Sequence, residues 1–222
     1  MGKRRLEDAI KQIDHPIEVT YRCFELDPTA ERDIEDNIYE KLAKKYGMSI
    51  DQAKANTQNM VNMAKEVGLD YRMDTMILTN TFDAHRLVMF AKTKGLMKEV
   101  TERILKAFFT ESRHIGDHET LTELAVETGL NRDEVAEMLS SDDMAVEVRA
   151  DEKAAQQIGV TGVPFYLINN KYALTGAQPT EVFVQALRKV IAEEEENKIT
   201  LLNSDSEDGV VCDENGCEIP KK

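Results

Sequence analysis

The chain has 222 residues, 41% of them hydrophobic and 32% charged, which is ordinary for a globular protein that buries its own core. Its 42 acidic and 28 basic residues give a formal net charge of −14, which argues against binding to nucleic acid or to an anionic membrane surface. No apolar stretch is long enough to cross a bilayer, and no apolar region follows the basic residues at the start. We therefore expect a cytoplasmic protein without a secretory signal.

The first elements predicted along the chain are a helix and then a strand. From Lys3 to Ile13 the apolar side chains recur on one helical face. The next segment alternates and is rich in β-branched and aromatic residues, which predicts a strand over Ile17–Cys23. Parallel strands are joined by a crossover helix, and here a helix precedes a strand with no strand before it. The chain therefore reads as if it begins inside a β-α-β unit.

From about Ile34 to Ala155 the pattern predicts helices only. Ser49 with Gln52 three residues later forms a capping box for a helix that ends near Gly68. Other residues suited to begin helices are Asn80, Thr81, Asp117, Asn131 with Glu134, and Ser140 or Ser141 for the last helix, which ends at Gly159.

The spacing of the apolar residues then changes from that of helices to that of the two strands of a hairpin. A strand over Val163–Ile168 is followed by the turn residues Asn169-Asn170, a second strand over Lys171–Leu174, and a helix with Pro179 in its first turn. Beyond Glu196 the chain is polar and is predicted to be a flexible acidic tail. The expected division is 1–33 and 156–196 in one folded part, 34–155 as a helical insertion between them, and 197–222 as the tail.

Three segments, residues 21–28, 80–86 and 159–179, resemble FrnE-type DsbA-family oxidoreductases. The resemblance implies an α/β fold with a thioredoxin-like sheet and a large all-helical insertion. In that family a Cys-x-x-Cys ends the first strand, directly before a helix that starts like Gly2–Glu7. This chain has neither that strand nor that motif. A start codon assigned too late, an artificial truncation and a degenerate gene would all produce this pattern. The absent strand is expected between Ile17–Cys23 and Val163–Ile168.

The resemblance also implies which residues contact substrate. It implies a cis peptide bond at Val163–Pro164, in a loop that pairs with an extended substrate segment, and it places His85 in the same substrate groove. On the residues alone, His85 is more simply a helix-start histidine bonded to nearby backbone. Lys3, Arg4 and Arg5 would add positive charge near a cysteine at the start of the first helix, or are solvated surface charges.

The three cysteines have different predicted roles. Cys23 lies in the predicted strand and is expected to be a buried, inert thiol. Cys212 and Cys217 are separated by four residues that could close a small disulfide loop, and the resemblance favours an auxiliary redox pair. Acidic neighbours such as Asp213 raise a thiol pKa, which suits a relay better than a primary nucleophile. A tail with two incidental cysteines and weak zinc binding are the alternatives, and we expect no other metal site.

The function implied by the resemblance is thiol–disulfide exchange or isomerisation on protein or small-molecule disulfides, without a bound cofactor. The chain as written, lacking Cys-x-x-Cys, is expected to be inactive or nearly so. One alternative is an activity like that of 2-hydroxychromene-2-carboxylate isomerases or kappa-class glutathione transferases, which use a serine and bound glutathione. Another is a non-catalytic peptide-binding module. Unpaired strand edges would also favour a homodimer or aggregation.

Overall fold

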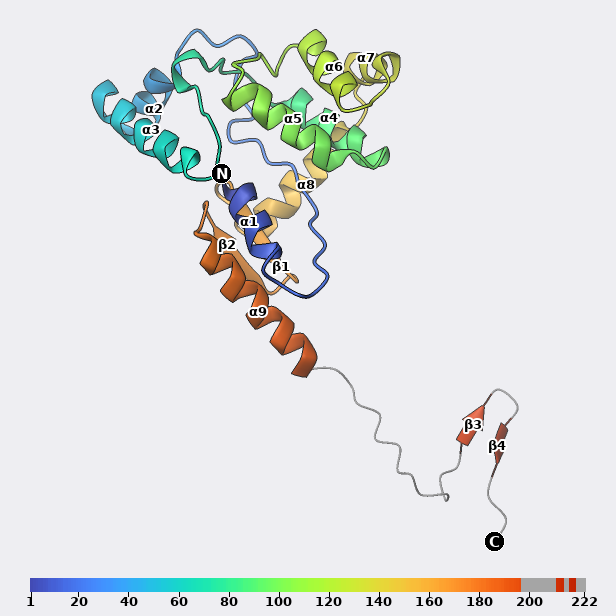
Figure 1. Cartoon of the computed structure of the whole chain (residues 1–222). Coiled ribbons are helices and arrows are strands. Elements are labelled where there is room, and N and C mark those ends of the chain that lie inside the picture. The colour runs from blue at the N-terminus through green and yellow to red at the C-terminus, as the bar shows by residue number, and fades with distance from the viewer. Residues whose placement is uncertain (197–210, 214–215, 219–222) are drawn as a thin grey trace.

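The computed structural model describes residues 1–196 and two short strands at 211–213 and 216–218 (Figure 1). Helix α1 (Gly2–Ile10) comes first. After a long extended segment, α2 (Ile38–Tyr46) and α3 (Ile50–Lys65) form a helical hairpin. The remaining helices of the insertion are the 3₁₀ turn η1 (Met73–Thr75), α4 (Phe82–Thr93), α5 (Met97–Phe109), α6 (His118–Glu127), α7 (Arg132–Ser140) and α8 (Ala145–Gln157). The later elements are β1 (Phe165–Ile168), β2 (Tyr172–Thr175), α9 (Thr180–Glu196), β3 (Val211–Asp213) and β4 (Gly216–Glu218).

The larger hydrophobic core belongs to the helical insertion. Helices α4 to α7 pack around it, and α8 runs from this body toward the strands (Figure 1). Its fully buried members include Leu87 of α4, Val100 of α5, Leu121 and Leu124 of α6, and Val135 of α7. Because these side chains lie at helical spacing on facing helices, the insertion has a core of its own.

A second, smaller core joins α1, α9 and the β1–β2 hairpin. Its buried members are Ala9 of α1 and Phe183, Val184 and Leu187 of α9. The ring of Tyr166 in β1 meets the ring of Phe183 edge to face, with centroids 4.7 Å apart. The hairpin is thus fixed to the two helices on one face, as expected for an α/β layer.

The hairpin confirms the sequence prediction. β1 and β2 pair antiparallel, with Phe165 opposite Thr175 and Ile168 opposite Tyr172. Asn169 and Asn170 both have positive φ, at 48° and 54°, which is the backbone that a two-residue hairpin turn requires. Asparagine tolerates this region better than most residues, so the turn could be recognised from the sequence.

The strand predicted over Ile17–Cys23 was wrong. The chain is extended there but no strand forms, because no neighbouring strand in the described part of the chain offers it backbone partners. Side chains of α8 accept the backbone N–H groups of this segment instead. The Cys23 N–H donates to Asp151 Oδ2 at 2.9 Å, and the Glu25 N–H donates to Glu152 Oε1 at 3.3 Å. Two carboxylates on one helix thus bind alternate N–H groups, as a strand edge would.

The predicted helix caps are mostly confirmed. Ser49 and Gln52 form both bonds of a capping box, and Asn131 and Asp117 accept backbone N–H groups at the starts of α7 and α6. The start of the last helix of the insertion was wrong, because α8 begins at Ala145 rather than at Ser140 or Ser141. Among the described residues, no helix combines the length and the apolar character needed to cross a membrane.

Candidate functional site

The first turn of α1 lies directly against the loop that contains Pro164. A Cβ atom added to Gly2 would collide with the Tyr166 hydroxyl and lie 3.2 Å from Pro164 Cγ and 3.5 Å from Ala177 Cα. Glycine is therefore required at this close approach. The start of α1 and the proline loop form one locus, although they are about 160 residues apart in the chain.

A shallow pocket of about 260 Å³ opens beside this locus. It is lined by Gly159, Thr161, Gly162, Val163, Pro164, Phe165, Thr175 and Gly176. The Val163–Pro164 peptide bond is cis, and the Val163 side chain is 48% exposed. Within the described residues β1 pairs only with β2, so the other edge of β1 has no strand beside it. The loop and this edge together present backbone groups to an extended segment.

The basic residues at the start of α1 are ion-paired. Lys3 Nζ lies 2.7 Å from both Glu7 and Glu102, and the Arg4 guanidinium binds the same two carboxylates. Arg5 donates to the Ala177 carbonyl at 2.6 Å. Glu102 belongs to α5, so these pairs connect the helical insertion to α1. The residues are therefore neither solvated charges nor an unbalanced positive cluster.

His85 lies between the extended segment and α8. Burial lowers the pKa of the imidazole, although Glu152 and the nearby backbone of Phe24 oppose this shift. The Cys23 thiol donates to the His85 carbonyl at 3.8 Å. Burial, reinforced by Asp151, raises the pKa of Cys23 to about 12, so Cys23 is the buried, unreactive thiol that the sequence predicted. Contact of His85 with a substrate stays a prediction.

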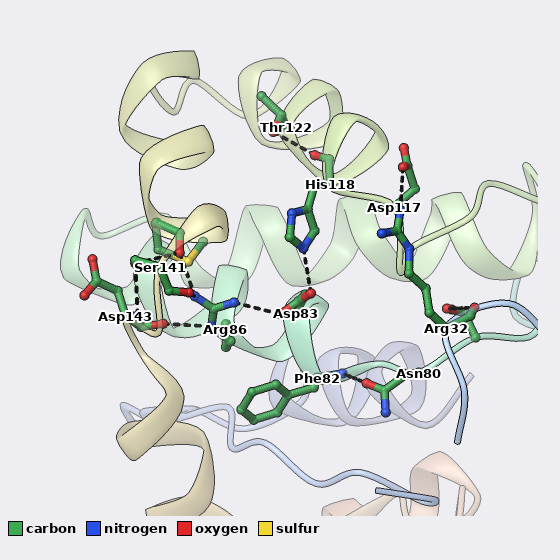
Figure 2. Close-up of polar contacts among 12 residues, drawn as sticks. Arg32, Asn80, Phe82, Asp83, Arg86, Asp117, His118, Thr122, Ser141 and Asp143 are labelled. Carbon is green, nitrogen blue, oxygen red and sulfur yellow. Dashed lines mark hydrogen bonds and ion pairs between the residues drawn. The ribbon is translucent and has the colours of Figure 1, made fainter. Parts of the chain in front are cut away.

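The rest of the 80–86 motif builds the insertion (Figure 2). Asn80 accepts the Phe82 N–H at the start of α4 and donates to the Ala30 carbonyl, which joins α4 to the extended segment. Arg86 is buried and binds three carbonyls at the C-terminal end of α7 and in the turn before α8, those of Met138, Ser141 and Asp143, at 2.5–2.8 Å. These bonds tie α4 to the turn that joins α7 to α8.

Asp83 balances the buried Arg86 charge. It lies 2.7 Å from Arg86 Nη1 and 2.7 Å from His118 Nε2, as the dashed lines in Figure 2 show. Burial would raise the pKa of Asp83, but the bonds to His118 and Arg86 together hold it below its usual value. His118 is thus a half-exposed partner of Asp83. No group of three metal-binding side chains occurs among the described residues.

Cys212 and Cys217 are backbone partners. β3 and β4 pair antiparallel, and the register places Cys212 directly opposite Cys217. The side chains of both cysteines lie outside what the structure describes.

Three acidic residues of this region were missed by the sequence analysis, namely Glu25, Asp151 and Glu152. A signal existed for Glu25, because it shares the phase of Tyr21 and Cys23 and therefore faces the buried side. Asp151 and Glu152 occur in an ordinary charged helix, and nothing local marks them as backbone acceptors.

Comparisons with known proteins agree with this geometry. Residues 1–188 match the family model of the DSBA-like thioredoxin domain. The chain is 28% identical over 200 residues to an uncharacterized protein, YwbO, of Bacillus subtilis strain 168, covering 89% of this chain and 92% of that protein. It superposes with a TM-score of 0.84 and 38% identity on the crystal structure of probable DsbA oxidoreductase SCO1869 from Streptomyces coelicolor, over 99% of this chain and 93% of that one.

A more distant likeness, which concerns the fold alone, is to the cytosolic disulfide reductase DsbM from Pseudomonas aeruginosa with GSH. Its TM-score is 0.59 at 15% identity, over 86% of this chain and 92% of that one.

Proposed function

The chain belongs to the DSBA-like thioredoxin domain family, and from this premise we propose that its fold serves thiol–disulfide exchange on protein or small-molecule disulfides. The observation that carries the proposal is the contact between the first turn of α1 and the Pro164 loop. An extended substrate would lie along this loop and the open edge of β1, with Val163 as its side-chain contact and His85 beside the groove.

We propose that this 222-residue chain does not catalyse the exchange at an enzymatic rate. The nucleophile of such a reaction is a thiolate favoured at a helix N-terminus, and Gly2–Arg5 supply no thiol at the start of α1. The only thiol described in residues 1–196 is Cys23, which is buried and has its pKa raised to about 12.

The test is reduction of insulin by dithiothreitol with and without the chain. We expect precipitation of insulin chains at the uncatalysed rate, because residues 1–196 place no accessible thiolate beside Pro164. A DsbA-family protein with an intact Cys-x-x-Cys serves as the positive control. Acceleration by this chain that matched the positive control would reject the proposed inactivity.

Cys212 and Cys217 are proposed as an auxiliary redox pair. When both thiols are oxidised, one S–S bond forms, and two protons and two electrons pass to a partner disulfide, which is reduced to two thiols. Cross-strand partners have Cβ atoms about 4.5–5.5 Å apart, close to the reach of a disulfide. Thiol titration in denaturant should find all three cysteines after reduction and only Cys23 after equilibration with oxidised glutathione. Cys212→Ser with Cys217→Ser should give one thiol in both states.

A second candidate function is non-catalytic peptide binding, favoured by the exposed Val163 and the open edge of β1. On this reading an extended peptide binds the Pro164 loop, and binding survives alkylation of all three thiols. Titration calorimetry with an unstructured peptide, before and after iodoacetamide treatment, measures this. Val163→Asp should weaken binding, while Val146→Asp, which alters an exposed valine of α8, should leave it unchanged.

We also propose the cofactor requirement, the partners, the oligomeric state and the location of the protein. No bound cofactor is invoked, and glutathione binding is the alternative that the isomerase-like activity would require. The net charge of −14 supports protein or small-molecule partners over nucleic acid or membranes. The open edge of β1 supports a homodimer. We propose a cytoplasmic location, in keeping with the cytosolic DsbM that shares the fold.

A further inference from the structure

Two carboxylates and one arginine meet where the extended segment joins α8. Arg149 Nη1 lies 2.5 Å from Glu25 Oε2 and 2.6 Å from Glu152 Oε2, so a single nitrogen serves both acids. The Glu25 side chain is 0% exposed, and its second oxygen, Oε1, is buried without a hydrogen-bond partner. A buried carboxylate with one unsatisfied oxygen and a second carboxylate beside it is costly when both are ionised.

A proton on Glu25 removes this cost. Burial raises the pKa of Glu25, Arg149 opposes the shift, and Glu152 adds to it, while Glu152 itself keeps a pKa below its usual value through Arg149 and the Glu25 backbone N–H. Of the two acids, Glu25 is therefore the one on which a proton is favoured, and Glu152 the one on which the negative charge is favoured. The other charged groups that face the pair are Asp151 of α8, Arg22 of the segment itself and His85 of α4.

We propose that Glu25, Glu152 and Arg149 form a proton-operated latch, which holds residues 22–25 on α8 while Glu25 is protonated and releases them when Glu25 loses its proton. The remaining contacts of the segment are consistent with a local opening. Cys23 and Glu25 each give one N–H to α8, Arg22 pairs with Asp151, and Cys23 packs against Met89 and Val148. Among the described residues no strand ladder adds to these contacts. Breaking a few side-chain bonds frees the segment without unfolding the insertion.

The direction of the pH effect follows from the thermodynamic linkage between proton binding and closure of the segment. A group whose folded pKa is raised stabilises the closed segment at pH values below its unfolded pKa, about 4.3 for glutamate, and this stabilisation is lost as pH rises through the folded pKa. Glu152, whose pKa is lowered, contributes above about pH 4.3 and loses its effect only in more acid solution. From pH 5 upward, Glu25 therefore opens the latch with rising pH. His85, whose pKa burial lowers, acts in the opposite direction and favours the closed segment as pH rises toward about 6.5.

Cys23 reports the opening, because its thiol is buried and bonded to the His85 carbonyl when the latch is closed. In the full chain, iodoacetamide labelling of the peptide that contains Cys23 is followed by mass spectrometry between pH 5 and pH 8. An opened thiol reacts about tenfold faster per pH unit below its pKa, because the thiolate fraction rises tenfold. We expect the rise per pH unit to be steeper in the natural sequence than in a variant without the Glu25 carboxyl, in which only the thiolate and His85 effects remain.

Substitutions separate the latch from a general effect of pH. Glu25→Gln keeps the shape and the hydrogen-bonding groups but carries no titratable proton, so labelling should rise less steeply per unit than in the natural sequence, and the difference is the excess due to Glu25. Glu152→Gln should also reduce the excess and is a second route if Glu25→Gln fails to fold. Glu147→Gln, an exposed acid on the same helix, should keep the excess.

The latch would be overturned by an equal rise per pH unit in the natural sequence, in Glu25→Gln and in Glu152→Gln. Hydrogen exchange of the α4 and α5 amides in the same samples must stay slow. If it accelerates in parallel with Cys23 labelling, the protein unfolds globally, and this would also contradict a latch. None of these results bears on the proposed thiol–disulfide exchange.

Discussion

Arg86→Met should destabilise the protein by roughly 3–5 kcal/mol, the cost typical of breaking a buried, hydrogen-bonded charge pair by removing one partner. The Arg86 side chain is only 5% exposed, and methionine fills a similar volume without donors. Three carbonyls between Met138 and Asp143 would lose their donor together, and Asp83 would lose its buried counter-charge. The Met138 carbonyl would keep the N–H and hydroxyl of Ser141 as donors, so the loss falls mainly on the Ser141 and Asp143 carbonyls and on Asp83.

The measurement is thermal or urea unfolding followed by circular dichroism. For a chain of this size a loss of that order lowers Tm by roughly 10 °C or more. Arg132→Met is the matched control, since Arg132 makes only an exposed ion pair with Glu119 and its loss should change Tm little. Lysine at position 86 should recover only part of the stability, because one ammonium cannot reach the positions of the planar guanidinium donors. Full stability in Arg86→Met would refute the role assigned to this residue.

Phe183→Ala should also cost roughly 3–5 kcal/mol, but its effect should be confined to one part of the molecule. Phe183 is 0% exposed and is the largest member of the small core between α1, α9 and the hairpin. Its ring also supports Tyr166, whose hydroxyl abuts Gly2 at the start of α1. Because the core of the insertion shares none of these side chains, α4 to α7 should remain protected.

Hydrogen exchange followed by mass spectrometry distinguishes the two parts. In Phe183→Ala, amides of β1, β2 and α1 should exchange faster, while those of α4 and α5 change little. Phe183→Leu should show a smaller effect of the same kind, because much of the apolar volume remains. Gln185→Ala, an exposed position on the same helix, is the control. Equal acceleration in both parts would mean that the two cores unfold as one unit and would contradict the separation described here.

Local signals in the sequence determined much of this fold. The capping residues of α3, α6 and α7 bond backbone N–H groups within three residues, so their effect is written in the adjacent sequence. The same holds for Asn169 and Asn170, whose tolerance of positive φ fixes the hairpin turn. The three matched segments carried the family assignment, because they span the Pro164 loop, the start of α4 and the extended segment.

Tertiary structure alone decided the rest. A β-branched run such as Ile17–Cys23 favours an extended backbone, but a strand exists only where another strand supplies its hydrogen bonds. Here the Asp151 and Glu152 side chains accept the backbone N–H groups in place of a neighbouring strand. The turn before α8 is bonded to Arg86 of α4, 57 residues from the Asp143 carbonyl. Lys3 and Arg4 pair locally with Glu7, but their link to the insertion depends on Glu102 of α5. Each outcome rests on a partner distant in the chain, which local propensity and periodicity cannot register.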